Sequence, residues 1–179
     1  MNANVMLDLE TMGNGSNAAI IAIGAVEFFP ETGLLGREFY EVISLESSAA
    51  NGGVIDASTI LWWMQQSAEA RAEFVQEGQH IFTALQLFSA WIPEKALVWG
   101  NGADFDNVIL RAAYNNSGMV APWKFYNSRC FRTLKNLFPK VQKPVDGPVA
   151  HKALDDARWQ AEQAILMLQQ LTVPEVPEQ

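Results

Sequence analysis

Cysteine is almost absent from this chain of 179 residues, which has one, Cys130, and only two histidines. A single cysteine excludes an internal disulfide framework and zinc sites of the CxxC type. It also fits a reducing compartment, so we expect the protein in the cytoplasm. No apolar run is long enough to span a bilayer. The amino terminus, MNANVMLDLE, lacks the basic region and the cleavage site of a signal peptide.

Basic residues are also few, with 12 Lys and Arg against 20 Asp and Glu, for a net charge of -8. Taken alone, this balance argues against a simple nucleic-acid binder, which usually presents a basic face. The argument weakens if the protein holds divalent cations. Two bound Mg²⁺ ions would change the net charge from -8 to -4 and would put positive charge where a phosphate has to sit.

The content of 49% apolar and 18% charged residues indicates a globular chain. We expect one domain over residues 1–172 and a carboxy-terminal tail over 173–179. Alternating and apolar segments predict strands over 3–9, 18–28, 37–44, 96–100 and 123–127. The first three strands would form an antiparallel meander. Helical periodicity and caps predict helices over 56–64, 67–74, 80–92, 105–117, 128–138 and 152–171. This order predicts an α/β domain with a mixed sheet flanked by helices.

The stretch MLDLET, residues 6–11, puts two carboxylates into a strand that otherwise looks buried. Side chains alternate along a strand, so Asp8 and Glu10 point to the same face and repel each other. One explanation is that this face of the strand is solvated. The apolar neighbours instead favour a central strand, in which paired carboxylates need a reason.

Two further segments place acidic residues where an element begins. In GNGADFDNVIL, residues 100–110, Asp104 is expected to cap a helix, and Asp106 follows in its first turn. In HKALDDA, residues 151–157, His151 precedes Asp155 and Asp156 at the start of the last helix. Each segment alone also fits an ordinary helix start, where the helix dipole favours acids.

Taken together, the three segments collect carboxylates with few competing thiols or imidazoles, a set that suits hard cations such as Mg²⁺ or Mn²⁺. Two such ions about 4 Å apart can clamp the attacking and leaving oxygens of a phosphodiester. A metal between them would explain why like charges are tolerated at Asp8 and Glu10. Other acids are expected on a solvated face without chemistry, namely Glu27, Glu31, Glu38, Glu41 and Glu46.

The chain resembles the DEDDh 3′→5′ exonucleases, which have a ribonuclease H-like fold with a mixed five-stranded sheet. The resemblance rests on DLET at 8–11, NGADFD at 101–106 and HKALDDA at 151–157. Within that superfamily the chain is similar to compact bacterial and prophage enzymes of the RNase T and exonuclease VIII type, which have segments like TILWWMQQSAEAR and RCFRTL. Those enzymes usually carry an acidic residue where this chain has Cys130.

The resemblance implies a catalytic set of four metal ligands and one general base, His151. It implies two divalent cations, Mg²⁺ or Mn²⁺, and hydrolysis from the 3′ end of single-stranded DNA or RNA, or of 3′ overhangs, to nucleoside 5′-monophosphates. Thr11 and Met12 would contact the terminal sugar and base. Similar enzymes often pair, which leaves a homodimer open. The four implied ligands are Asp8, Glu10, Asp106 and Asp156.

Spacing alone would choose a different partner for the histidine. On a continuous helix His151 and Asp155 share a face, whereas Asp156 lies about 140° away. The family pattern chooses Asp156, and both statements hold if His151 lies in the loop before the helix.

The remaining candidates are expected to be structural. His80 is expected on the surface. Most tryptophans are expected in the core, except Trp62, which could line a groove or a dimer interface because Trp63 takes the other face. Two explanations stay open for a basic cluster: a solvated helix face, or a phosphate track leading to the site. The cluster comprises Lys124, Arg129, Arg132, Lys135, Lys140 and Lys143.

Two alternatives to an exonuclease on single strands remain. One is a phosphohydrolase of the same fold that acts on oligonucleotides or dinucleotides. The other is a non-catalytic nucleic-acid-binding module, against which the presence of all five motif residues argues.

Overall fold

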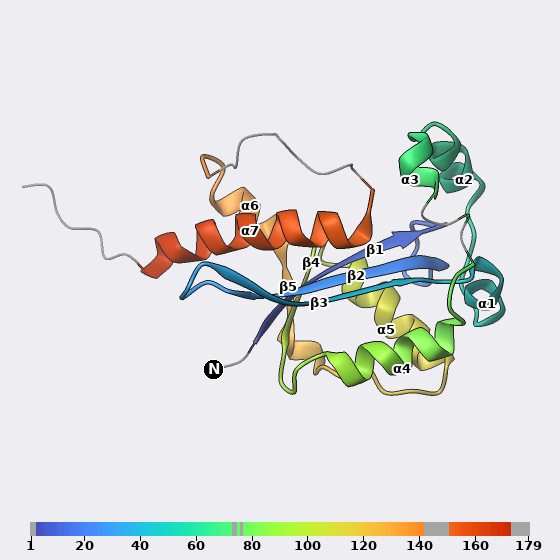
Figure 1. The fold of residues 1–179 in the computed structure, drawn as a ribbon, viewed down its shortest axis with the longest axis horizontal. Coiled ribbons are helices and arrows are strands. Elements are labelled where there is room, and N and C mark those ends of the chain that lie inside the picture. The colour runs from blue at the N-terminus through green and yellow to red at the C-terminus, as the bar shows by residue number, and fades with distance from the viewer. Residues whose placement is uncertain (1–2, 73–74, 76, 142–150, 173–179) are drawn as a thin grey trace, which may run out of the picture.

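A mixed five-stranded sheet forms the centre of the protein, as seen in a computed structural model that describes residues 3–72, 75, 77–141 and 151–172 (Figure 1). The strand order is β3-β2-β1-β4-β5. β1 pairs antiparallel with β2, and β2 with β3, whereas β4 lies parallel to both β1 and β5. The predicted meander and mixed sheet are therefore confirmed. The strands span β1 Asn4–Thr11, β2 Ile20–Phe29, β3 Leu34–Val42, β4 Leu97–Gly100 and β5 Ser128–Cys130.

Helices cover both faces of the sheet (Figure 1). The long helix α7 and the short α6 lie on one face, α4 and α5 lie on the other, and α2 and α3 sit at the end of the sheet where β1 finishes. Their bounds are α1 Leu45–Ala50, α2 Ala57–Met64, α3 Ala68–Ala72, α4 Ile81–Trp91, α5 Asp106–Asn116, α6 Phe131–Leu137 and α7 Ala153–Thr172. Within the described ranges, no helix is both long and apolar enough to cross a membrane.

The alternation of β1 decides which residues meet which helices. Val5, Leu7 and Leu9 are buried in a cluster with residues of α4 and α5. Met6 is buried in a second cluster with residues of α7. Since Asp8 and Glu10 follow Met6 at intervals of two, both lie on the α7 face; the sequence predicts that they share a face but not which helix covers it.

Several local expectations were wrong. Residues 123–127 were expected to form a strand, but they contain the 3₁₀ helix η1 (Phe125–Asn127), and the strand follows at 128–130. Ser128 therefore starts β5 instead of capping a helix, and α6 is capped by Cys130, whose Sγ accepts from the Thr133 N–H at 3.4 Å. A strand of three residues is too short to show an alternating sequence pattern, and its formation depends on pairing with β4.

Two acidic residues also differ from expectation. Asp104 is exposed and does not cap α5, which begins after Phe105 without a side-chain cap. Glu27 is 6% exposed and forms an ion pair with Arg37 at 2.5 Å across β2 and β3, so it is not part of a solvated face. The helix α1 was not expected, and Phe74 at the predicted end of α3 lies outside the described residues.

Candidate active site

A cavity of about 620 Å³ opens where the central strand β1 ends and α7 begins. This is the carboxyl end of the parallel strands β1 and β4, where α/β sheets place their ligands. No Lys or Arg occurs among the described residues that line it. The polar and aromatic side chains in its wall include Asp8, Glu10, Thr11, Trp62, His151, Asp156 and Gln160.

Three of the five residues implied by the resemblance form a tight cluster. Ligand atoms of Glu10, His151 and Asp156 all lie within 4.8 Å of one another. Asp8 lies beside them on β1, and its Oδ1 accepts a hydrogen bond of 2.7 Å from Gln160 Nε2 on α7. The structure thus brings side chains together that are about 150 residues apart in the sequence.

The clustered carboxylates perturb one another. Burial raises the pKa of Asp8 well above its usual range, and the nearby charges of Asp106, Glu10 and Asp156 raise it further, against the hydrogen bond from Gln160. Burial also raises the pKa of Asp156. Without a counter-ion, the folded protein therefore favours protons on these groups.

Asp106 approaches the cluster from the start of α5. It is 2% exposed, and its two carboxylate oxygens accept from the Leu9 N–H at 3.1 Å and from the Asn101 N–H at 2.8 Å. Burial raises its pKa to about 6, and these two hydrogen bonds oppose the rise. Gly100 permits this approach, because a Cβ there would lie 2.9 Å from Asp106 Oδ2.

A second glycine lets α7 come close to the sheet. Gly24 on β2 is paired with Asp8 on β1. A Cβ on Gly24 would lie 2.2 Å from the Ala153 carbonyl carbon, at the first residue of α7. The backbone contact that glycine allows brings the first turn of α7, and Asp156 in it, over the carboxylates of β1.

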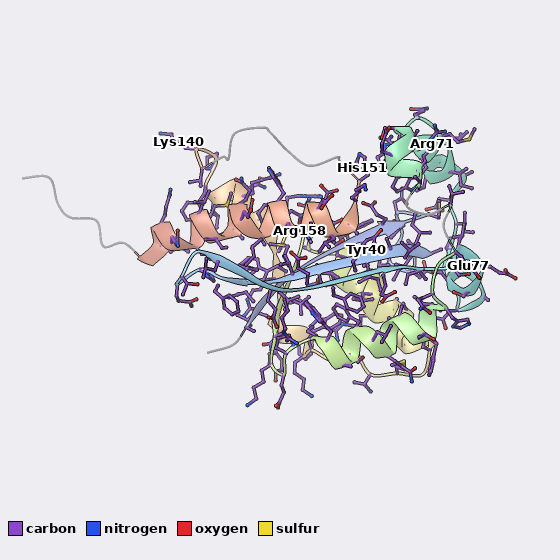
Figure 2. The ribbon with its side chains drawn as sticks, in the orientation of Figure 1. Tyr40, Arg71, Glu77, Lys140, His151 and Arg158 are labelled. Atoms are coloured by element: carbon purple, nitrogen blue, oxygen red, sulfur yellow. The ribbon has the colours of Figure 1, made fainter. Side chains whose placement is uncertain are left out.

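His151 lies in the loop that precedes α7, the position at which the spacing argument and the choice of Asp156 are compatible (Figure 2). Its backbone is left-handed, with φ 72, and its N–H donates to Asp156 Oδ2 at 2.9 Å. Asp155 instead forms an ion pair with Arg158 Nη1 at 2.9 Å and does not line the cavity. The structure therefore separates the two adjacent aspartates.

Two tryptophans of α2 hold the other side of the imidazole. The His151 ring meets Trp62 edge-on at 4.8 Å and Trp63 at 6.0 Å between ring centroids. Both line the cavity, but Trp63 is buried and donates from Nε1 to the Thr11 carbonyl at 2.9 Å, whereas Trp62 is 41% exposed. Of the two roles left open for Trp62, the groove wall is the one seen here.

The two expected substrate residues lie in different surroundings. Thr11 lines the cavity, and its Oγ1 donates to the Gly13 carbonyl at 2.7 Å. Met12 is 6% exposed and packs in a small buried cluster that includes Ile21 and Trp63.

Gln160 was missed by the sequence reasoning. It is 4% exposed, donates to Asp8, and its Oε1 is buried without a partner among the described residues. A signal existed, because Gln160 follows Asp156 by four residues and so lies on the same face of α7.

Comparisons with known proteins extend over most of the chain. The model of the 3'-5' exoribonuclease Rv2179c-like domain matches residues 3–168. The chain is 29% identical to an exodeoxyribonuclease of Enterobacteria phage T4, over 84% of this chain and 82% of the relative.

Solved structures of exonucleases share the fold. The nuclease domain of 3'hExo, a DEDDh family member bound to rAMP, is similar with a TM-score of 0.64 and 16% identity, over 94% of this chain and 92% of that one. E. coli exonuclease I bound to single-stranded DNA has a TM-score of 0.68 and 14% identity, over 95% of this chain. The chain spans 41% of the length of exonuclease I. The likeness confirms the expected ribonuclease H-like fold.

Proposed function

This chain belongs to the family of the 3'-5' exoribonuclease Rv2179c-like domain, and from that premise we propose that it removes nucleotides from the 3′ end of single-stranded nucleic acid with the help of divalent cations. One observation carries the metal dependence. The cavity is lined by the carboxylates of Asp8, Glu10 and Asp156, and no Lys or Arg occurs among its described lining residues. A phosphate can enter such a cavity only if another positive charge neutralises it.

The side chains fit hard cations. Four carboxylates and one imidazole offer mainly oxygen ligands, a set that suits Mg²⁺ or Mn²⁺. The raised pKa values of Asp8, Asp106 and Asp156 support the same conclusion, because each would be relieved by a nearby cation. We propose that Asp8, Glu10, Asp106 and Asp156 hold two ions, which would supply positive charge to the phosphate and make the attacking water more acidic.

His151 is the proposed general base. Its imidazole would take the proton of the water that attacks the terminal phosphorus, and the bond between that phosphorus and the 3′ oxygen would break. The product would be a nucleoside 5′-monophosphate. The hydrogen bond from the His151 N–H to Asp156 and the edges of Trp62 and Trp63 support a fixed imidazole orientation.

The proposed contacts of Thr11 and Met12 with the terminal nucleotide differ in whether the protein must change conformation to make them. Thr11 already lines the cavity, so its backbone can border the terminal sugar without rearrangement. Met12 is buried, and its contact with a base would require the loop after β1 to open.

DNA and RNA are both proposed substrates. The T4 relative is named an exodeoxyribonuclease, whereas the family model is named for an exoribonuclease. The choice depends on contacts to one 2′-hydroxyl. Pairing into a homodimer is a separate proposal, which light scattering tests.

The test uses 3′-labelled and 5′-labelled single-stranded DNA and RNA oligomers, incubated with Mg²⁺, Mn²⁺ or EDTA. We expect a ladder that shortens from the 3′ end, needs metal and is lost in Asp8→Ala. The ladder would also rank DNA against RNA. Cleavage of dinucleotides alone would favour the phosphohydrolase alternative. No cleavage of any oligomer, with metal bound, would overturn the role given to His151.

A further inference from the structure

The cations of this acidic chain are unevenly distributed. No Asp or Glu occurs from residue 107 to residue 145, although the chain has 20 of them. Seven of the 12 cations fall in this stretch: Arg111, Lys124, Arg129, Arg132, Lys135, Lys140 and Lys143. The stretch includes most of α5, then η1, β5 and α6.

Several of these cations are already engaged or lie elsewhere. Arg111 stacks on Trp123 at 5.1 Å. Arg129 Nη1 donates to the carbonyls of Tyr126 and Ser128, so its guanidinium turns back toward η1. Lys124 precedes β5, whereas α6 follows it. Lys143 lies outside the described residues.

Arg132 connects the remaining cations to the cavity. It is exposed on the first turn of α6, and its Nη2 donates to the Asn101 carbonyl at 2.6 Å. Asn101 lines the cavity, on the loop that follows β4. The guanidinium of Arg132 is thus anchored at the cavity rim.

Lys135 and Lys140 continue from Arg132 along α6. Lys135 is exposed and lies three residues later, on the same side of the helix. Lys140 is exposed beyond the end of α6, and Figure 2 shows it on the same side of the sheet as His151 but far from it. Within the described part of the chain, none of the three cations forms an ion pair, although the charge of Arg132 lowers the pKa of Asp106 at the cavity. Lys135 Nζ lies 5.8 Å from the centre of the Phe131 ring on its own helix.

Two of the cations outside this stretch are paired with carboxylates. Arg37 is paired with Glu27, and Arg158 with Glu38 and Asp155. Exposed cations that form no ion pair, in a row that begins at a cavity proposed to bind phosphate, are typical of a surface for a nucleic-acid backbone.

We propose that Arg132, Lys135 and Lys140 form a basic track that binds the phosphates of a single strand on the 5′ side of the bond being cleaved. The proposal rests on the proposed function and deepens it, because it makes the substrate a strand of several nucleotides. The 3′ end enters the acidic cavity, and the preceding phosphates lie along α6. A dinucleotide without a 5′-phosphate contains only the phosphate that is cleaved, so it has none to place on the track.

The test compares two double variants with the same loss of charge. Lys135→Gln with Lys140→Gln removes the distal part of the track. Lys95→Gln with Lys124→Gln is the matched control, because both of these lysines are exposed and lie outside the track. Each lost phosphate contact should reduce the slope of log affinity against log salt by about 0.7 for a single strand.

The first readout is binding of 5′-fluorescein-labelled dT12 in EDTA, where no cleavage occurs. We expect the track variant to bind more weakly, with a salt slope smaller by about 1.4, and the control to match wild type. The second readout is the ratio of kcat/KM for dT12 to that for a dinucleotide, which should fall about 10-fold in the track variant alone.

The outcomes separate the track from the enzymatic function. Equal effects of the two double variants, or no effect of either, would overturn the track while leaving 3′ cleavage standing. Weaker binding in the track variant alone, with no cleavage of any strand by wild type, would support the track and overturn the proposed function.

Discussion

The two sides of the cavity are held in place by different means. On the acidic side, Asp106 receives two main-chain N–H groups and Asp8 receives the amide of Gln160. On the other side, His151 lies outside any helix or strand, and its own backbone is left-handed. Its ring has the edges of Trp62 and Trp63 as neighbours.

This difference shows where the site is rigid. The carboxylates of Asp8, Glu10 and Asp106 are carried by regular elements, the first two by β1 and the third by α5, where Gly100 admits it. The position of His151 in the loop before α7 depends on two contacts between elements, that of α7 with Gly24 and that of α2 with the end of β1. Changes in α2 should therefore affect the base without affecting the carboxylates.

The largest expected loss of activity is at Asp156, which is one of the carboxylates and also contacts His151. Asp156 lines the cavity and accepts the His151 N–H, whereas Asp155 faces away and pairs with Arg158. We expect Asp156→Asn to abolish cleavage and Asp155→Asn to leave most of it, measured as kcat/KM on a labelled single strand. The two variants remove the same charge from adjacent positions, so each is the control for the other. The reverse result would show that the helix-face argument, and not the family pattern, selects the partner of His151.

The next effect should be confined to the acidic side. Gln160→Met keeps the volume of the side chain but removes the N–H that Asp8 accepts at 2.7 Å. Loss of such a supporting hydrogen bond typically weakens metal affinity about 10- to 100-fold, and we expect this range for Mn²⁺ by calorimetry. The melting temperature in EDTA should not fall, because the variant also removes the unpartnered Oε1.

The matched control is Gln169→Met, at a position on the same helix where the amide donates to the Pro30 carbonyl, away from the cavity. A metal affinity that falls equally in both variants would mean that α7 as a whole, and not the contact with Asp8, sets the affinity.

A smaller effect should appear on the base side alone. Trp62→Ala removes the edge contact with His151 at 4.8 Å and leaves the carboxylates unchanged. An aromatic pair of this kind is worth about 0.5–1.5 kcal/mol, so kcat should fall about 2- to 12-fold with unchanged Mn²⁺ affinity. Trp62→Phe should restore most of the rate. Leu61→Ala is the control, since Leu61 is 60% exposed and does not line the cavity. A loss of Mn²⁺ affinity in Trp62→Ala would show that the two sides are coupled.

The sequence predicts the acidic side better than the rest of the site. The alternation in β1 is a local pattern, so the shared face of Asp8 and Glu10 can be read directly. The hydrogen bond from Leu9 N–H to Asp106 joins residues 97 apart, and no local pattern predicts it. The ion pair of Glu27 with Arg37 likewise depends on how β2 and β3 pair, next to a bulge between Val26 and Phe28. Long-range pairing decided these two features, whereas Gln160 had a local signal in its spacing from Asp156.

The smallest expected effect concerns stability and follows from the raised pKa of Asp8. Burial, with the charges of Asp106, Glu10 and Asp156, makes the folded protein hold the Asp8 proton more tightly than the unfolded chain does. The stability that this proton contributes is therefore present at low pH and is lost as pH rises through the raised pKa. In the absence of metal, the melting temperature of Asp8→Asn should be close to that of wild type near pH 4 and higher than that of wild type at pH 8.

The expected difference at pH 8 is a few degrees, because each kcal/mol corresponds to about 2–4 °C in a chain of this size. Asparagine is uncharged like the protonated acid, and its Oδ1 still accepts from Gln160. Excess Mg²⁺ should reverse the order, since only the wild-type carboxylate gains a cation. Thermal melts in EDTA and in Mg²⁺ at both pH values measure this. If the melting temperature of Asp8→Asn does not exceed that of wild type at pH 8 in EDTA, the acidic side is not destabilised by repulsion among its own charges. The argument that a metal relieves this repulsion would then fail.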